Sequence, residues 1–433
     1  MFELAAPIED LARETRLREP GGPTRRRFLQ AAAVAGGVTA AGIPTWLAER
    51  AAAATPLATT DGIVVVVTLL GGNDSMSTLV PISGADRGRY TTARPTLAYP
   101  AASLLPVGDG TWGLHPYLTR LAARYAQGSV ALVRGVGTNG DGSHFATRDT
   151  MMAGTATTDR STGWLGRYSD GLTEWGSGFR ELAVGPTVPL HLIGDRVDVT
   201  ALPSVGTLWG SDTTTRYEQT AYAAIRAMAA GPTGLGAMAD ATAAATRDAV
   251  DRAATVRSLY GAALPTTLLS QDLALAARAI NADLGTRCLT VSRLGWDTHA
   301  MQAATHNGLL AELDQAIDLF FTSLSPSFRN RVTMLVVSEF GRRFPENAGR
   351  GTDHGAAGIA MVIGDNVQGG LYGAHPSLAT LDAAGGLVPT VDLRSVYASL
   401  LDGWLDGDAS GTLGGTYEDL HLFRAGPGVT PAP

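Results

Sequence analysis

The segment "GWDTH" (295–299) places two potential metal ligands, Asp297 and His299, two residues apart. It follows the run 288–292, whose apolar and β-branched residues predict a strand. A carboxylate and an imidazole that leave the same strand can reach one ion, and this mixture suits zinc, manganese or iron better than calcium. His299 alone could equally be an ordinary histidine of a surface loop. The hypothesis of a metal site therefore depends on whether similar groups follow other strands.

The elements that would position such groups alternate between strands and helices. Short runs with many β-branched residues predict five strands that are buried on both faces, as in a parallel sheet. These runs span 63–70, 130–136, 288–292, 332–338 and 359–364. Helical patterns alternate with them, for example the amphipathic stripe over 307–324. The alternation predicts a three-layer, doubly wound α/β domain with a mostly parallel sheet.

Polar residues gather next to these predicted strands, and open α/β sheets bind ligands at the carboxyl ends of their strands. The predicted metal ligands are Asp74, Asp297, His299, Glu339, Asp353 and His354. So many acidic groups in one place need a cation to hold them together. The sequence therefore predicts one or two divalent ions, around which the carboxyl groups of Asp74, Asp297 and Glu339 and the ring of His299 converge.

Simpler roles exist for several of these residues. Asp74 could do no more than cap a turn or a helix. Glu339 and Arg342 could form only a salt bridge. His115, which stands before a proline in "GLHP", is better explained as a residue of a helix entry than as a ligand. The coincidence of the other groups at strand ends is what favours a shared site.

The composition excludes several function classes. The chain has 433 residues, a net charge of −7, and 33 basic residues that are all arginine. The absence of lysine rules out Schiff-base chemistry, a Walker phosphate loop and a kinase lysine. The acidic balance, with no basic patch outside the N-terminus, speaks against binding to nucleic acid. The single cysteine, Cys288, lies in an apolar run and is predicted to be a packing residue.

An export signal is predicted at the N-terminus. Residues 24–29, "TRRRFL", resemble the twin-arginine motif, and a modest Ala- and Gly-rich apolar stretch follows them. That stretch is too weak for a convincing membrane span. We therefore expect a signal peptide over 1–54, recognition by the twin-arginine translocase, export from the cytosol, and no stable membrane span after cleavage. The remaining domain, 55–433, is predicted to carry a helical insertion at about 210–280 and a loose tail at 424–433.

Seven motifs, in order along the chain, resemble those of the DUF1501 proteins. They are "LGGNDSMSTLVP", "GLHP", "GSHFATRDTMMAGT", "TGWLGRY", "GWDTH", "SEFGRR" and "GTDHG". The family is in turn similar to the alkaline phosphatase-like superfamily of phosphatases, sulfatases, phosphodiesterases and phosphoglycerate mutases. The resemblance implies that fold, a site for one or two metal ions, and hydrolysis of phosphate or sulfate esters.

The resemblance also implies roles for single residues. Asp74 corresponds to the metal aspartate of the first strand, and Glu339 to an aspartate of an Asp-His pair whose histidine is replaced here by Phe340. Ser143 or His144 stands where the nucleophile is expected, although metal-bound hydroxide is an alternative. Arg342 is a candidate clamp for the oxygens of a small anionic ester.

Two other functions remain open. An exported, non-catalytic scaffold that binds an envelope partner would explain why the histidine at position 340 and a standard nucleophile are missing. A glycosidase that uses two of the carboxylates fits less well, because adjacent histidines suit metal ligation better than an acid/base pair.

Overall fold

The computed structural model describes residues 56–138, 144–155, 160–172, 178–185, 187–204, 216–228 and 234–431. The chain divides into two compact units, which are described separately. The smaller includes Asp212–Arg252, and the larger comprises Arg50–Ser211 and Ala253–Pro433. The predicted signal peptide and Ser143 lie outside the described residues.

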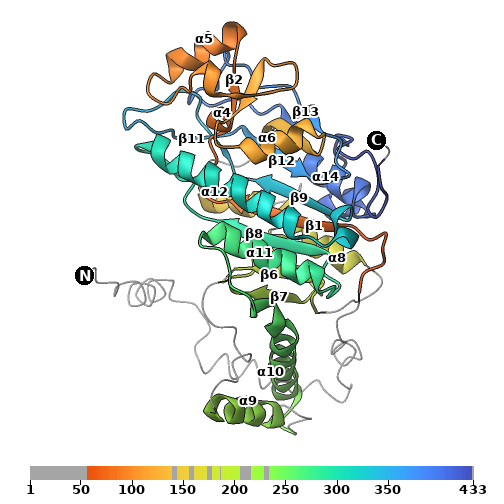
Figure 1. Ribbon diagram of the computed structural model, residues 1–433. Coiled ribbons are helices and arrows are strands. Elements are labelled where there is room, and N and C mark those ends of the chain that lie inside the picture. The colour runs from red at the N-terminus through yellow and green to blue at the C-terminus, as the bar shows by residue number, and fades with distance from the viewer. Residues whose placement is uncertain are drawn as a thin grey trace, which may run out of the picture. The chain divides into compact units, whose positions relative to one another are not determined.

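The larger unit is organised around a central sheet (Figure 1), which has nine strands in the described part of the chain. Their order is β13-β5-β12-β9-β1-β8-β6-β7, and β14 pairs with β5. The strands are β1 (Ile63–Leu69), β5 (Val130–Gly137), β6 (Glu181–Val184), β7 (Val199–Leu202), β8 (Cys288–Arg293), β9 (Val332–Val337), β12 (Gly358–Ile363), β13 (Gly370–Tyr372) and β14 (Val391–Asp392).

The directions of these strands explain where polar loops meet. β1 pairs in parallel with β8 and β9. On the other side of β8, β6 pairs in parallel with β8, and β7 pairs in parallel with β6. β12 runs antiparallel to both of its neighbours, β5 and β9. The loop that enters β12 therefore lies at the same edge as the carboxyl ends of β1, β8, β9 and β5.

Helices cover both faces of the sheet. Because β1 is buried on both sides, Val65 and Val67 belong to one core and Val64 and Val66 to the other. The first core includes α6 (Thr119–Ala126), α11 (Leu268–Asn281) and α12 (Gln302–Ser323). The second includes α7 (His144–Ala153), α8 (Trp164–Gly171), α14 (Leu393–Gly403) and α15 (Ala409–Leu413). Figure 1 shows α11 and α12 side by side across one face.

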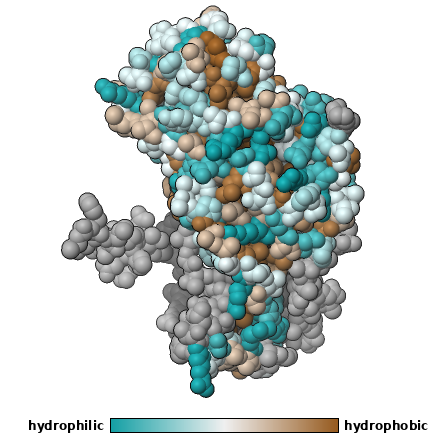
Figure 2. All heavy atoms as spheres, viewed as in Figure 1, coloured by the Kyte–Doolittle hydropathy of each residue, from teal (hydrophilic) through white to brown (hydrophobic). Residues whose placement is uncertain are grey.

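Smaller elements complete the larger unit. Short strands β2 (Leu79–Pro81), β3 (Leu105–Val107) and β4 (Trp112–Leu114) form an antiparallel sheet. The remaining helices are α4 (Ser75–Thr78), α5 (Gly84–Ala93) and α13 (Pro326–Arg329), and β10 (Gly341–Arg342) pairs with β11 (His354–Gly355). On the face shown in Figure 2, apolar residues form small patches among polar ones, as on most protein surfaces.

The described part of the smaller unit is mostly helical. It contains α9 (Arg216–Met228) and the first part of α10 (Ala237–Val256). Arg226 forms an ion pair with Asp251 and so links these two helices.

The predicted fold class, a three-layer α/β domain with a mostly parallel sheet, is confirmed, and all five predicted strands are present. The run 359–364 differs in direction, because it forms antiparallel β12, and a buried apolar run carries no signal for strand direction. The tail after 424 is also bound more closely than predicted. Its carbonyl groups at Gly426 and Val429 accept hydrogen bonds from the Asn366 side chain, and Gly428 N–H donates to the Asn330 carbonyl.

Candidate metal site

Three potential ligand atoms converge at the carboxyl edge of the central sheet. The Nε2 atoms of His299 and His354 lie 2.9 Å apart, and Oδ1 of Asp297 lies 3.0 Å from the first and 3.2 Å from the second. Donor atoms at about 2.0–2.1 Å from a tetrahedral zinc ion lie roughly 3.3 Å from one another. The triangle formed by Asp297, His299 and His354 is therefore close to the spacing that one ion requires.

A fourth group, His144, faces the other oxygen of Asp297. It is the first residue of α7, and its Nε2 lies 3.4 Å from Asp297 Oδ2. Ligand atoms of His144, Asp297 and His354 all lie within 4.8 Å of one another. The side chains of Asp297 and His144 are 45% and 36% exposed, so the cluster can be reached from solvent.

Two of the histidines are oriented by carboxylates that contact Nδ1, the ring nitrogen on the side away from the cluster. Nδ1 of His299 lies 3.2 Å from Asp353 Oδ1, and Nδ1 of His144 lies 3.2 Å from Glu339 Oε1. With Nδ1–H donating to a carboxylate, each ring presents the lone pair of Nε2 to the cluster, as in carboxylate–histidine–metal arrangements. Asp353 itself accepts from the Asn347 side chain, and this hydrogen bond is the main reason why the pKa of Asp353 lies below its usual value.

Asp297 is held as a carboxylate by its neighbours. Its partial burial acts to raise its pKa, but hydrogen bonds from Arg342 and His354 and the positive charge of Arg342 outweigh this and lower the pKa to about 2. Nη2 of Arg342 lies 2.7 Å from Asp297 Oδ1. The oxygen that faces the two imidazoles is therefore ionised near neutral pH, as metal ligation requires.

Arg342 is fully buried and is bound by backbone carbonyl groups. It donates to the carbonyls of Gly72 (2.9 Å), Thr352 (2.9 Å), Trp296 (3.0 Å) and Gly71. Its Nη1 also lies 3.5 Å from His299 Nε2. Each of its five N–H groups thus faces an acceptor within the protein. These contacts position Asp297 and do not support the predicted role of Arg342 as a clamp for substrate oxygens.

Two glycines allow the loop after β1 to pass beneath the cluster. Gly71 has φ +119°, and a Cβ there would lie 2.3 Å from the backbone nitrogen of Asp297. Gly72 has φ +92°, and a Cβ there would lie 2.4 Å from the ring of Phe340. A side chain at either position would therefore displace the loops that carry the site. The N–H of Gly71 donates to Glu339 Oε1 at 2.7 Å, which fixes the carboxylate behind His144.

The structure does not bring Asp74 into this cluster. Asp74 is fully buried, and its oxygens accept from Arg94 at 2.5 and 3.0 Å, from Gln302 at 2.6 Å and from Ser77 at 2.7 Å. Burial alone would raise the pKa of Asp74, but the charge of Arg94 holds it well below the usual value. Asp74 also caps α4 by accepting from Met76 N–H, which is the simpler role considered above. The expected convergence of Asp74, Asp297, Glu339 and His299 is thus wrong for Asp74, whose oxygens are already bound, and Glu339 reaches the site only through His144.

The buried network around Asp74 contains residues that the sequence did not indicate. Arg94 and Gln302 donate to Asp74, and His306 Nε2 lies 3.1 Å from Asn73 Oδ1. Gln302 and His306 belong to the first turns of α12, directly after "GWDTH". Their position on a buried helix face was a possible signal, because polar residues on such a face need partners.

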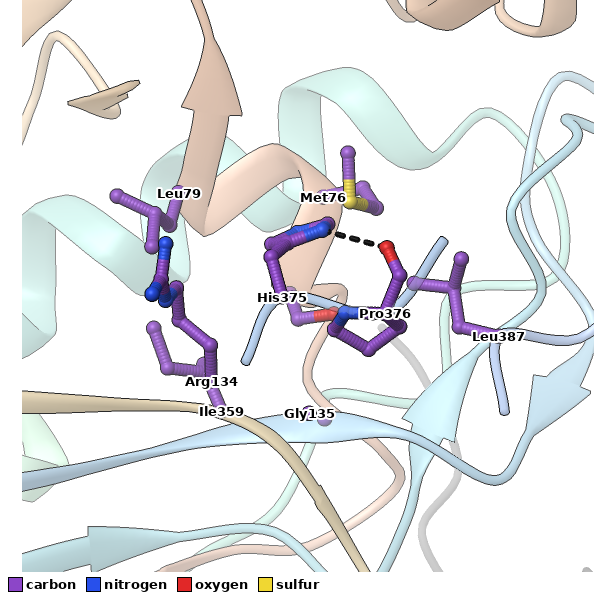
Figure 3. Close-up of a pocket in the computed structure, with 10 residues that line it drawn as sticks. Met76, Leu79, Arg134, Gly135, Ile359, His375, Pro376 and Leu387 are labelled. Carbon is purple, nitrogen blue, oxygen red and sulfur yellow. Dashed lines mark hydrogen bonds between the residues drawn. The ribbon is translucent and has the colours of Figure 1, made fainter. Parts of the chain in front are cut away.

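A pocket elsewhere at the strand ends has a different character (Figure 3). It has a volume of about 250 Å³, including its open mouth, and none of its lining residues belongs to the metal cluster. Arg134 and His375 are its charged or titratable residues, and Arg134 Nη2 donates to the Gly373 carbonyl at 2.7 Å. Burial lowers the pKa of His375 to about 4, and its ring stacks on Trp112. His375 is therefore a neutral, packed side chain at neutral pH.

Comparisons with known proteins identify a family and a set of distant structures. The sequence model of the DUF1501 family, described as protein of unknown function, matches residues 138–395, more than half of the chain. No curated protein sequence matches. Among solved structures, PsFucS1 sulfatase from Pseudoalteromonas sp. has a TM-score of 0.38 at 11% identity, covering 90% of this chain and 75% of that one. Ps i-CgsB in complex with k-i-k-neocarrahexaose has a TM-score of 0.35 at 11% identity, covering 86% and 76%. BT1596, a 2-O GAG sulfatase, has a TM-score of 0.27 at 8% identity, covering 71% and 65%. Similarities of this size do not indicate a function for this chain.

Proposed function

The chain belongs to the DUF1501 family, and from that premise we propose that it is an exported, metal-dependent hydrolase of phosphate or sulfate esters with an alkaline phosphatase-like fold. The observation that carries the proposal is the convergence of Asp297, His299 and His354, with His144 beside them, at the carboxyl edge of the sheet. One carboxylate and two or three imidazoles form a donor set that suits zinc, manganese or iron.

The residues of the cluster have distinct parts in this proposal. The chemistry that a divalent ion would supply at this cluster is that of a Lewis acid, which polarises an ester oxygen and activates water. Asp297, His299 and His354 would hold the ion, and Asp353 would keep the tautomer of His299 that presents Nε2. Arg342 would keep Asp297 in place and ionised.

His144 is the residue proposed to handle the proton of the attacking group. Its Nδ1–H donates to Glu339, so the lone pair of Nε2 is available to accept a proton from a hydroxyl group. That hydroxyl belongs either to water or to Ser143, the preceding residue. When the leaving alcohol departs, the same Nε2–H can return the proton.

Export is proposed from the sequence. The twin-arginine motif at 24–29 is followed by a stretch that would be cleaved near residue 54. Among the described residues, no helix has the length and apolar character that crossing a bilayer requires. Since the twin-arginine translocase transports folded proteins, the ion would be bound before export.

The test is to isolate the protein after export by its own signal and to measure its metal content and its activity together. We expect bound zinc, manganese or iron and hydrolysis of aryl phosphates, phosphodiesters or aryl sulfates that chelation abolishes. A protein that carries no metal, and whose stability and activity ignore chelators, would contradict the proposal.

A second function is favoured by one observation. Four of the five N–H groups of Arg342 face oxygen atoms of the protein and the fifth faces the ring of His299, so this buried cation is bound within the site and is not presented to a substrate anion. A non-catalytic metal-binding scaffold for an envelope partner would need no such group. Stoichiometric metal without turnover of any ester in the panel would support this alternative.

A further inference from the structure

We infer that the pocket of Figure 3 binds a small monocarboxylate with an apolar substituent, and that Arg134 and Ser75 bind its carboxylate group. The residues that line the pocket come from α4, β2, β5 and β12 and from the loops around 375 and 387. None of them belongs to the metal cluster, so the site is separate from the proposed ester hydrolysis and does not depend on it.

Arg134 supplies the positive charge of the pocket. Its Nε and Nη2 donate to the carbonyl groups of Tyr372 (3.4 Å) and Gly373 (2.7 Å). Within the described residues, its Nη1 has no hydrogen-bond partner and no carboxylate lies at ion-pair distance from its guanidinium. The acidic group that acts on it from farther away is Asp109, whose Oδ1 accepts from Thr111. Two backbone carbonyls thus fix the guanidinium and leave one of its nitrogens for an anion.

A bound anion would offset the cost of burying Arg134. Burial lowers the pKa of this half-buried guanidinium, which means that its charged form is solvated less well than in water. The ring of His375 is neutral at pH 7 and stacks on Trp112, so it adds no second positive charge. One positive charge in the pocket is balanced by a monoanion.

Ser75 offers a second donor. It is the first residue of α4 and lines the pocket, and its hydroxyl group makes no hydrogen bond within the described part of the chain. One guanidinium nitrogen and one hydroxyl group can bind the two oxygens of a carboxylate. A phosphate or a sulfate would hold further oxygens against the remaining walls, where they would lose hydration without gaining partners. The donors therefore favour a carboxylate.

The remaining walls and the size of the pocket define the rest of the ligand. Apolar side chains form most of these walls, namely Met76, Leu79, Ile359, Pro376 and Leu387. Figure 3 shows the side chain of Arg134 extending toward Leu79, so an anion bound to it lies beside apolar groups. Gly135 has φ +67°, and a Cβ there would lie 3.0 Å from the ring of Pro376, so the glycine lets this wall approach β5. The volume of about 250 Å³ is below the roughly 300–1,000 Å³ typical of sites for drug-sized ligands, so the acid is small.

The test is calorimetric titration of the intact exported protein with acetate, butyrate, hexanoate and benzoate, and with phosphate and sulfate. We expect saturable binding of the carboxylates, with dissociation constants on the order of a millimolar or lower. Affinity should rise from acetate to hexanoate, because the longer chain buries more apolar surface against the walls. Absence of saturable binding, no gain with chain length, or equal affinity for phosphate or sulfate would overturn the inference.

Substitutions locate the bound acid. Arg134→Gln should weaken the binding of hexanoate by about 10- to 100-fold, as expected for a hydrogen bond to a charged group, and Ser75→Ala by about 2- to 10-fold. Arg134→Lys keeps the charge and should retain more affinity than Arg134→Gln. Arg424→Gln is the matched control, because Arg424 also donates to a backbone carbonyl, that of Asp365, and does not line the pocket. Hexanoate binding that is as strong in Arg134→Gln as in the native protein would place the acid elsewhere and overturn the inference.

Two further comparisons keep the test decisive. If loss of the guanidinium unfolds the chain, Ser75→Ala and Arg134→Lys, which are smaller changes at the same two donors, carry the test. Repeating the titrations after treatment with a chelator separates the pocket from the metal cluster, and we expect the loss caused by Ser75→Ala to be the same in both forms. A protein that binds hexanoate through Arg134 but hydrolyses no ester supports the inference and removes the hydrolase. An active hydrolase that binds no carboxylate in this pocket does the reverse.

Discussion

Asp74 and Asp297 follow two neighbouring parallel strands, β1 and β8, yet their surroundings differ completely. Asp74 is fully buried, and donors from Arg94, Gln302, Ser77 and the helix backbone occupy both of its oxygens. Asp297 is 45% exposed and faces three imidazole rings. A carboxylate at a strand end is thus available to a metal only where its neighbours can present lone pairs. Where its neighbours are permanent donors, it becomes part of the scaffold.

The largest expected effect is on metal binding, and it should separate the two aspartates. Asp297→Asn removes the ionised ligand of the cluster, so we expect metal affinity to fall by more than about 100-fold, beyond the range typical of indirect contributions. Asp74→Asn should leave the metal content of the folded protein unchanged, because Asp74 does not touch the ligands. Isothermal titration with zinc measures both. Equal losses in the two variants would contradict the distinction drawn here.

The free energy of unfolding should also distinguish the two aspartates, and here the larger loss is expected at Asp74. Asp74→Ala leaves the buried guanidinium of Arg94 without its partner, which costs about 3–5 kcal/mol in the free energy of unfolding. Asp297→Ala should cost clearly less, because Arg342 keeps its four carbonyl acceptors. Urea unfolding of the metal-free proteins gives the comparison. A smaller loss for Asp74→Ala than for Asp297→Ala would show that the ion pair between Asp74 and Arg94 does not stabilise the fold as expected.

The sequence predicted that Asp297 belongs to the site, but it did not reveal that Asp74 is bound to Arg94, and the reason is physical. Strand runs such as 63–70 and 332–338 are visible because both faces are buried, and "GWDTH" is visible because a carboxylate and an imidazole stand together. Asp74 looked equivalent, because its partner Arg94 lies 20 residues away in a segment without any motif. A donor that arrives through tertiary folding leaves no local signal.

His354 shows a second limit of prediction from sequence, which is the direction of a strand. It was predicted as a ligand although it precedes its strand instead of following it, and a purely parallel sheet would have placed it at the opposite edge. The structure brings it to Asp297 because β12 is antiparallel to β9 and β5. Sequence patterns thus indicated the residue, while the strand direction that makes it useful came only from the structure.

An effect of intermediate size on metal affinity or catalysis is expected at Glu339, whose carboxylate contacts Nδ1 of His144. Glu339→Gln keeps an oxygen that can accept from Gly71 N–H, but it removes the charge that orients the imidazole. We expect metal affinity, or catalysis if His144 acts as the base, to fall about 10- to 100-fold. Glu346→Gln is the matched control, because the side chain of Glu346 accepts hydrogen bonds from the backbone N–H groups of Thr96 and Leu97, away from the metal cluster. If both variants behave alike, the role of Glu339 behind His144 is wrong.

The smallest expected effect concerns the pH dependence of stability, and it belongs to the buried region. Burial lowers the pKa of His306, which binds Asn73 beside the Asp74 network, to about 4 from its usual 6.5. Between these values the unfolded chain takes up a proton that the folded chain does not, so the free energy of unfolding falls as pH falls from 6.5 to 4. The slope is at most about 1.4 kcal/mol per pH unit for this one histidine.

A substitution at His306 tests this directly. His306→Gln can keep a donor to Asn73 but does not titrate, so its stability curve should be flatter than that of the native protein over pH 4–6.5, as followed by urea unfolding. His421→Gln, at a side chain that is 87% exposed, should leave the slope unchanged. His191 and His115 are also neutral when folded, since burial lowers the pKa of each. Some slope must therefore survive in His306→Gln, and only an unaltered slope would show that His306 is already protonated in the fold.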